Sequence, residues 1–457
     1  MSAPERRPWQ GRRMHFVGVG GAGMSAYARA AHALGAEVSG SDGAESPYLE
    51  RLREDGVLAQ ARIGHDATNV PEGAEVELFY SSAVPAENPE RAAARERGLA
   101  ERPRAELLGE LSALRRTIAV AGTHGKTTTS SMVVHALRAA GLDPGWLIGA
   151  PIGGGLANAH WSETGEWLVV EADESDRSML SLSVEVAVLT NAELDHHATF
   201  ASLAELREAF ARFAALARSA VVVWDRPELL ELAPAAGRGQ GPEPVPYDVP
   251  SPVLTAEGAR FDWRGHEVRL AVPGAHNALD AAAALEAARL AGADPERAIK
   301  GLEDFHGAGR RFQLLGRSAG GASVYDDYAH HPTEVAATLD AARTLEHRRL
   351  VAAFQPHLYS RTALLAREFG AALARADAVV VLDVYPARER AEDHPGVSGL
   401  LIAEAAADAA AGRPVYWLPR IEDAAAVLGG LLRAGEVCVV MGAGDVDRLG
   451  PELVGAR

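Results

Sequence analysis

The sequence predicts an α/β protein with three domains. Short apolar runs, the pattern of buried parallel strands, alternate with longer stretches rich in Ala, Leu, Glu and Arg. At about 150 residues per domain, a chain of 457 residues is long enough for about three domains. The alternation of strand and helix patterns starts afresh twice along the chain. We therefore expect domains over residues 1–108, 109–313 and 314–457.

The strand patterns can be placed one by one. In chain order they are MHFVGVG (14–20), LFYSSA (78–83), TIAVAG (117–122), EWLVVEAD (166–173), VAVLTN (186–191), AVVVW (220–224), RLVAAFQ (349–355), AVVVLDVY (378–385) and VCVVMGAG (437–444). Between them, helices are expected over 24–35, 126–140, 202–217, 276–291, 332–345 and 361–375. Residues 233–252 carry six prolines and three glycines, which predicts a loop, and 306–316 is expected to be a linker.

Composition excludes several classes of protein. The formal charge of −17 and the lack of a basic patch argue against binding to nucleic acid. No apolar run approaches the about 20 residues that span a bilayer, and the first residues lack the apolar core of a signal peptide. The single cysteine, Cys438, lies in an apolar run and is expected in the core. We expect a cytoplasmic protein, either a monomer or a homodimer.

The first candidate binding site is a set of glycines near the start. Gly18, Gly20 and Gly23 follow a predicted strand and open a predicted helix, as in a Rossmann-like nucleotide-binding domain. Asp42, 19 residues beyond Gly23, is placed to accept a ribose hydroxyl. A plain turn between strand and helix is the alternative, and the motif does not say which nucleotide would bind.

The second candidate is the stretch GTHGKTT (122–128), between a strand and a helix. It departs from the common phosphate loop because Val120 stands where that loop has its first glycine. However, the chain has only two lysines, and Lys126 falls at the position that reaches the β- and γ-phosphates. Thr127 follows it, and its hydroxyl can bind Mg²⁺. We interpret the stretch as the phosphate loop of a P-loop ATPase-type domain.

Acidic residues and a histidine follow two further strands. EADESD (171–176) carries four carboxylates at the end of a strand, and Asp195 and His196 lie just past the next one. The carboxyl ends of parallel strands are where α/β proteins bind ligands, and metal-bound triphosphate needs oxygen ligands there. Solvated surface charge is the alternative. The pattern favours a metal site or a role in acyl transfer.

Seven motifs, in order and including those above, give the chain a family resemblance: GTHGKTT, EADESD, TNAELDHH, GAHNALDAAAA, GAGRRF, DDYAHHPTE and FQPHLYSRT. The chain resembles the Mur ligases of peptidoglycan synthesis over essentially its whole length. The resemblance is strongest to those members that use ATP to join L-alanine to UDP-N-acetylmuramate. It implies that the compressed loop binds ATP and that the N-terminal domain binds the UDP-sugar. Because the acyl phosphate formed in such a reaction must be kept from water, we expect the third domain to close over the other two.

The resemblance also implies a role for individual residues. For ATP these are Gly122, Thr123, His124, Gly125, Lys126, Thr127, Thr128, Asn277, Arg310 and Arg311. For the UDP-sugar they are Gly18, Gly20, Gly21, Gly23, Met24, Asp42 and Ser82. His330 and Arg361 are expected to hold L-alanine, and Thr127, Glu171 and His196 to hold two Mg²⁺ ions. Lys126, Glu171, His196, His330 and Arg361 are the expected catalytic residues.

The family pattern is broken at two positions. Asp280 stands where relatives often have an asparagine, and Leu358 where some have an arginine. Relatives that add later amino acids carry a carbamylated lysine in the central domain. The only other lysine, Lys300, lies far along the sequence from DHH, which favours the first addition step.

Three alternatives stay open at this point. Within the family, the chain could attach a recycled tripeptide to the same sugar nucleotide. Outside it, the chain could be a nicotinamide dehydrogenase using the N-terminal glycines, or an ATP-driven regulatory protein without ligase turnover. The dehydrogenase leaves the phosphate loop and the acidic residues unexplained.

Overall fold

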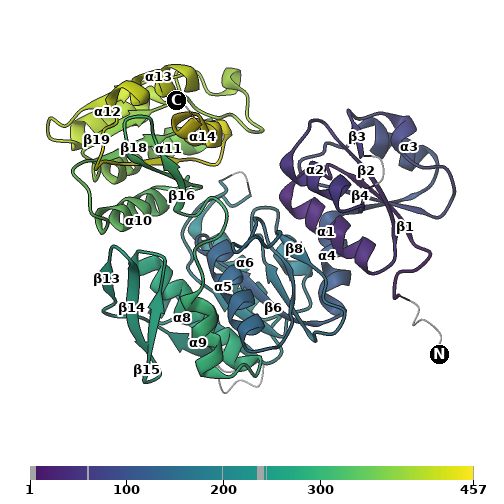
Figure 1. Ribbon diagram of the computed structural model, residues 1–457. Helices are drawn as coiled ribbons and strands as arrows, with labels where there is room; N and C mark the ends of the chain where they lie inside the picture. Colours follow the sequence, from purple (N-terminus) through teal and green to yellow (C-terminus); the bar gives the residue numbers. More distant parts are fainter. Residues whose placement is uncertain (1–6, 59–60, 198, 234–240, 243, 456–457) are drawn as a thin grey trace. The chain divides into compact units, whose positions relative to one another are not determined.

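The computed structural model describes residues 7–58, 61–197, 199–233, 241–242 and 244–455 (Figure 1). The chain forms two compact units. The first unit is Met1–Asp248 with Ala281–Leu302, and the second is Val249–Asp280 with Glu303–Arg457. Helix α8 (Ala275–Leu290) passes from one unit into the other.

The first sheet of unit 1 is wholly parallel, with strand order β3-β2-β1-β4-β5. Its elements are β1 (Arg13–Val17), α1 (Ala22–Ala33), β2 (Glu37–Asp42), α2 (Pro47–Glu54), β3 (Ala61–Ile63), β4 (Val76–Tyr80), α3 (Pro89–Glu96), β5 (Ala100–Pro103) and α4 (Arg104–Ala113). Apolar residues of α1, α2 and α4 pack on one face of the sheet, and those of α3 on the other. This is the predicted Rossmann-like arrangement.

The second sheet of unit 1 has the order β12-β11-β10-β6-β9-β7-β8 and is parallel except for β8. Its elements are β6 (Arg116–Ala121), α5 (Lys126–Ala139), β7 (Gly145–Leu147), β8 (Ala159–His160), β9 (Trp167–Glu171), β10 (Val186–Leu189), α6 (Leu203–Ala214), β11 (Ala220–Trp224), α7 (Pro227–Leu230) and β12 (Pro244–Tyr247). Helix α9 (Pro295–Glu303) follows α8. The central strands β6, β9 and β10 are buried almost throughout, as their apolar runs predict.

Unit 2 contains a small antiparallel sheet that the sequence did not reveal. It consists of β13 (Val253–Thr255), β14 (Gly258–Trp263) and β15 (His266–Leu270). Buried and exposed residues alternate along β14, so this sheet has one face on the core and one in solvent. Its strands carry charged residues on the solvent face, and these interrupt the apolar runs by which the other strands were predicted.

The last sheet has the order β16-β17-β21-β18-β19-β20, and only β16 runs antiparallel to its neighbour. Its elements are β16 (Gln313–Arg317), β17 (Ser323–Asp327), α10 (Pro332–Arg343), β18 (Leu350–Phe354), α11 (Tyr359–Leu373), β19 (Ala378–Val381), α12 (Leu400–Ala409), β20 (Val415–Trp417), α13 (Ile421–Leu431), β21 (Val437–Met441) and α14 (Leu449–Gly455). Helices α10, α11 and α12 pack on one face, and α13 and α14 on the other. Cys438 is buried in β21, as predicted.

The predicted α/β class and the three α/β sheet domains are confirmed. Two local predictions need correction. The proline-rich stretch contains the edge strand β12, where proline is tolerated because one side of an edge strand needs no hydrogen-bond partner; residues 234–240 and 243 lie outside the described part. The expected linker 306–316 ends early because β16 begins at Gln313. The boundaries at 108/109 and 313/314 stay predictions. Among the described residues, no helix is long and apolar enough to cross a membrane.

Candidate active site

The predicted phosphate loop connects β6 to α5, and its conformation depends on glycine. Gly122 has φ +135°, and a Cβ there would lie 2.1 Å from Thr190 Oγ1. Gly125 has φ +80° and precedes the first residue of α5, Lys126. The segment after β10 supports the loop, because the Asn191 side chain accepts from His124 N (2.8 Å) and donates to His124 O (3.0 Å). The loop is therefore a fixed turn at the start of a helix, the geometry that binds phosphates.

Lys126 lies at the centre of this site. Its Nζ donates to Gly122 O (2.6 Å), Thr123 O (3.1 Å) and Glu174 Oε1 (2.9 Å). Burial alone would lower the pKa of this ammonium, but nearby carboxylates, Glu174 foremost, raise it above its ordinary value. Lys126 is therefore a fixed positive charge at the phosphate loop.

Two predicted metal ligands, Thr127 and Glu171, are in direct contact. The Thr127 hydroxyl donates to Glu171 Oε1 (3.0 Å), and the other oxygen of Glu171 accepts from Gly149 N (2.7 Å). Glu171 is the last residue of β9, so its carboxylate lies at the carboxyl end of the sheet beside the loop.

His196 joins the same group through Glu174, a residue without a predicted role of its own. Its Nε2 lies 3.3 Å from Glu174 Oε1, the oxygen that also accepts from Lys126. Its backbone N donates to Asp195 Oδ1 (2.7 Å), and its φ of +53° is left-handed. Glu174 therefore belongs to the site, although it was not among the predicted site residues. EADESD offered four carboxylates, and nothing in one sequence says which of them faces Lys126.

These residues fit Mg²⁺-bound ATP. Glu174 Oε2 is buried and accepts no hydrogen bond from any residue in the described part of the chain, so a buried acceptor is left for a cation or water. Hydroxyl and carboxylate oxygens are the ligands that Mg²⁺ prefers. Thr127, Glu171 and Glu174 supply them next to a loop of backbone amides and one lysine.

The first glycine loop connects β1 to α1. Gly18 has φ +84°, and the N–H of Gly20 donates to Asp42 Oδ2 (2.8 Å). A Cβ on Gly20 would lie 2.9 Å from the same oxygen, so this glycine makes room for Asp42. Met24 is buried in α1, whereas Ser82 is exposed after β4. The structure thus brings Asp42 to the loop, as predicted, and fixes it there by its own hydrogen bond.

A second residue without a predicted role, Arg104, lies beside Gly23 of the first glycine motif and contacts the acidic segment after β9. It is the first residue of α4, and its guanidinium donates to Asp176 Oδ2 (2.6 Å) and Asp173 Oδ2 (2.7 Å). Burial would raise the pKa of Asp173, but Arg104 and then Lys126 hold it well below its ordinary value. Nothing in the sequence marks Arg104, because an arginine at a helix start usually lies in solvent.

Unit 2 holds the remaining predicted residues. Asn277 is buried in α8 and donates to Pro273 O (2.6 Å). Arg310 and Phe312, on either side of Arg311, have left-handed φ values of +55° and +49°. Arg310 donates to Asp326 Oδ2 (3.0 Å) and Gly442 O (2.8 Å), and the Phe312 N–H donates to Asp327 Oδ2 (2.7 Å). The guanidinium of Arg310 is therefore largely used to hold the chain in this conformation.

Arg311 lies over the same aromatic ring as Arg310. The guanidinium carbon of Arg311 lies 5.1 Å, and that of Arg310 5.2 Å, from the centre of the Tyr328 ring, and Arg311 Nη1 lies 3.9 Å from Glu334 Oε1. The hydrogen bonds of Arg310 and Phe312 hold the chain on both sides of Arg311. Both arginines keep their predicted ATP role as a proposal.

The two predicted L-alanine residues, His330 and Arg361, lie close together. The ring of His330 packs edge-on against that of His357, with centroids 6.0 Å apart, and Arg361 Nη1 lies 3.3 Å from His357 Nδ1. Arg361 is only 2% exposed, in the first turn of α11. Leu358, where the family pattern is broken, is buried with φ +71°. His357 connects the pair, and its place in FQPHLYSRT was the available signal.

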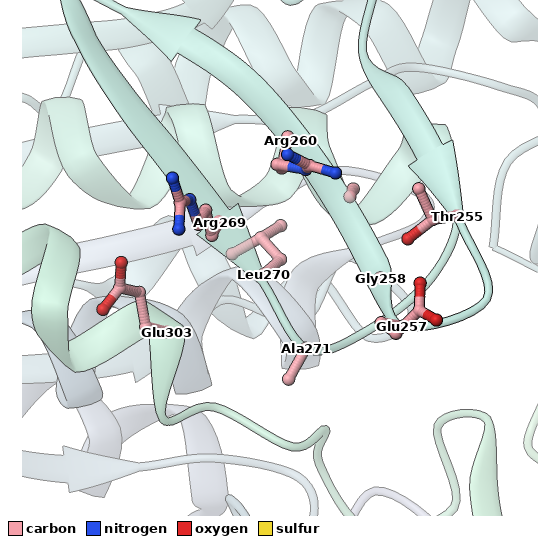
Figure 2. Close-up of a pocket in the computed structure, with 9 residues that line it drawn as sticks. Thr255, Glu257, Gly258, Arg260, Arg269, Leu270, Ala271 and Glu303 are labelled. Carbon is pink, nitrogen blue, oxygen red and sulfur yellow. The ribbon is translucent and has the colours of Figure 1, made fainter.

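A separate hollow of about 530 Å³ lies on the small sheet of unit 2 (Figure 2). Arg260 and Arg269, which face each other across β14 and β15, share its lining with the carboxylates of Glu257 and Glu303. Since two positive charges are matched by two negative charges, the hollow has no net preference for an anion. None of the predicted site residues lines it.

The fold and the phosphate loop are those of a nucleotide-binding α/β protein, with a cluster of carboxylates beside the loop. Three family profiles match the chain: "Mur ligase family, catalytic domain" over residues 13–116, "Mur ligase middle domain" over 120–288 and "Mur ligase, glutamate ligase domain" over 310–444. The chain belongs to the Mur ligase family.

Individual relatives are similar over nearly their full length. The UDP-N-acetylmuramate–L-alanine ligase of Kineococcus radiotolerans is 47% identical, covering 97% of this chain and 95% of that protein. The ligase of the same name from Rubrobacter xylanophilus is 45% identical over 97% of this chain and 99% of its own length.

Solved structures are similar as well. The UDP-N-acetylmuramate–alanine ligase of Thermotoga maritima gives a TM-score of 0.81 at 27% identity, covering 97% of this chain and 98% of that chain. A murein peptide ligase of Psychrobacter arcticus gives 0.70 at 23% identity, covering 98% of both chains, which shows the shared fold alone.

Proposed function

We propose that this chain is an ATP-dependent ligase that joins L-alanine to the lactyl carboxylate of UDP-N-acetylmuramate, the first amino-acid addition in peptidoglycan precursor synthesis. The observation that carries the proposal is the cluster of Lys126, Glu174 and His196 at the phosphate loop, in a chain 47% identical to a ligase of that name.

The chemistry requires activation of a carboxylate. A carboxylate is a poor acyl donor because oxide is a very poor leaving group. When bound, Mg²⁺-ATP supplies the phosphoryl group that turns the carboxylate into an acyl phosphate, with ADP released. The neutral amine of L-alanine then attacks the acyl carbon, and the tetrahedral intermediate collapses to the amide and phosphate. The amine proton passes to a base or to solvent.

In this scheme the chain's own residues position and neutralise charge. Lys126 would hold the γ-phosphate, and its ammonium is already fixed by the loop carbonyls and Glu174. Thr127 and Glu171 would hold one Mg²⁺, with Glu174 beside them. His196 would serve a second ion, so the two-ion arrangement is part of this proposal.

The other two substrates are assigned to other elements. The first glycine loop, with Asp42, would bind the UDP part of the sugar nucleotide at the N-terminus of α1. His330 and Arg361 would hold the carboxylate of L-alanine, and their contact through His357 supports a joint role. Asn277 and Arg311 would contact ATP.

We place the enzyme in the cytoplasm, where ATP is available, and expect a monomer or homodimer. Ligation of a recycled tripeptide is the weaker alternative, because the murein peptide ligase is less similar in fold and sequence than the relatives that add L-alanine.

The test is a phosphate-release assay with purified enzyme, ATP, Mg²⁺ and UDP-N-acetylmuramate, run across amino acids and small peptides. We expect phosphate only when both the sugar nucleotide and L-alanine are present. A stronger response to a tripeptide would support the alternative ligase. Oxidation or reduction of a nicotinamide, without phosphate release, would contradict both the L-alanine ligase and the tripeptide ligase.

A further inference from the structure

Arg104 lies where the two parallel sheets of unit 1 meet. Its side chain comes from the start of α4, directly after the edge strand β5 of the first sheet. Its two carboxylate partners, Asp173 and Asp176, follow β9 of the second sheet. The Arg104 side chain is only 14% exposed and that of Asp176 18%, whereas the Asp173 side chain is 37% exposed, so the ion pair with Asp176 is the better shielded from solvent.

The third nitrogen of the guanidinium faces α1. Arg104 Nη1 lies 3.0 Å from the position that a Cβ on Gly23 would take. Hydrogen bonds run from Nε and Nη2 of Arg104 to the two aspartates and none from Nη1 to a described residue, so Nη1 is the nitrogen next to Gly23 that these ion pairs do not use. Tyr27, one turn further along α1, is also buried, and the charges of Arg104, Asp173 and Asp176 act on it. A Cβ on Gly23 would therefore press on the Arg104 guanidinium, which would have to shift by a few tenths of an ångström.

The acidic segment 171–176 connects Arg104 to Lys126 of the phosphate loop. Asp173 and Asp176 lie on either side of Glu174, the carboxylate that contacts Lys126 and His196. Both aspartates also cap the local chain, since Asp173 Oδ1 accepts from Ser175 N (2.9 Å) and Asp176 Oδ1 from Ser178 N (3.0 Å). A displacement of Arg104 would therefore move the backbone that carries Glu174.

We propose that Arg104 is a positioning residue that couples the binding of the sugar nucleotide to the binding of Mg²⁺-ATP. This rests on the proposed function of the two loops. A ligand at the first glycine loop fixes Gly23 and thereby Arg104. Arg104 in turn holds Asp173 and Asp176, and so keeps Glu174 beside Lys126. A guanidinium can bind two carboxylates through its planar fork, which a lysine at this position could not do.

The experiment measures the affinity for UDP-N-acetylmuramate by calorimetry, without and with a saturating non-hydrolysable ATP analogue and Mg²⁺. For the wild-type chain we expect the analogue to change this affinity by about tenfold, within the usual range for coupled sites. The coupling factor is the ratio of the two affinities, with and without the analogue. In Arg104→Lys and Gly23→Ala this coupling factor should fall towards one. The control is Arg102→Gln, which removes a charge two residues away whose partners are Glu77, Glu106 and Glu110.

A second readout, amide hydrogen exchange, needs no nucleoside triphosphate. UDP-N-acetylmuramate alone should slow amide hydrogen exchange in residues 171–178 of the wild-type chain and of Arg102→Gln, but not of Arg104→Lys. Thermal unfolding shows that each variant is folded, and Gly23→Ala tests the same contact from α1 if Arg104→Lys is unstable.

The proposal would be overturned by a wild-type coupling factor of one, or by an unchanged factor in both Arg104→Lys and Gly23→Ala. Failure of the proposed function would look different, because the wild-type chain would then release no phosphate with UDP-N-acetylmuramate and L-alanine.

Discussion

Among single residues, Lys126 is the one on which the proposed chemistry depends most. It is one of two lysines, and it is held by two loop carbonyls and Glu174 at the start of α5. We expect Lys126→Ala to lower the rate of phosphate release by about 10³-fold or more, because a charge that neutralises the transferring phosphoryl group is lost. Binding of UDP-N-acetylmuramate should change only a few-fold. Lys300→Ala, at the exposed second lysine, is the control. Near-normal turnover of Lys126→Ala would remove the lysine from the mechanism.

Arg361 is the residue that we propose to bind the carboxylate of L-alanine. Because it is buried beside His357, it is not an exposed residue that merely caps its helix. We expect Arg361→Lys to raise the apparent KM for L-alanine by roughly tenfold or more, since an ammonium cannot bind a carboxylate through two parallel hydrogen bonds. The KM for ATP should change less. Arg367→Lys, on the exposed side of the same helix, should leave both constants unchanged. Equal changes in all three substrate constants would point to a structural role for Arg361.

At the scale of elements, the phosphate loop depends on a glycine that the common motif does not have at that spacing. A Cβ at Gly122 would overlap Thr190 Oγ1, and its φ of +135° is unfavourable for any other residue. We expect Gly122→Ala to destabilise the chain by roughly 3 kcal/mol or more, as steric overlap and backbone strain add. Gly141→Ala is a matched control, since its φ is +82° but its Cβ would meet open space. It should cost only about 1 kcal/mol. Similar unfolding midpoints for the two variants in denaturant would contradict this account of the loop.

Most of the strands and helices could be predicted from the sequence, and the exceptions have physical reasons. The buried parallel strands were predictable because their apolar runs are nearly unbroken, and the predicted helices start and end within a few residues of α1, α5, α6, α8, α10 and α11. The sheet β13–β15 was not predictable, because residues of β14 and β15 alternate between core and solvent and β13 has only three residues, none of them buried. In the site, Lys126, Thr127 and Glu171 follow from motif positions. Glu174 and Arg104 depend on which of several like charges the fold turns inward, and spacing along the chain cannot decide that.

At the scale of the whole molecule, unit 2 has a stability that depends on pH through a buried carboxyl group. Burial raises the pKa of Asp327 from an ordinary value of 3.8 to about 6, although Arg311 opposes the shift. Since the folded chain holds this proton more tightly than the unfolded chain, the stabilisation is present below pH 3.8. It is lost as the pH rises through about 6.

The expected loss between those limits is about 3 kcal/mol at most, at 1.36 kcal/mol per pKa unit. Asp327→Asn mimics the protonated form and should flatten the dependence of the unfolding free energy on pH in this window. Denaturant unfolding of both chains at pH 4.5 and pH 7 measures it. Parallel pH profiles for the two chains would show that Asp327 does not carry the effect.

The central claim concerns the whole reaction: ATP activates the lactyl carboxylate of the sugar nucleotide as an acyl phosphate, and L-alanine displaces the phosphate. The most direct measurement uses UDP-N-acetylmuramate labelled with ¹⁸O in that carboxylate. One carboxylate oxygen becomes the bridge to the transferred phosphorus and leaves with it when the amine attacks. We therefore expect mass spectrometry to find one ¹⁸O atom in each phosphate released and the other in the amide of the product. Unlabelled phosphate, with both ¹⁸O atoms still in the recovered sugar nucleotide, would contradict the account.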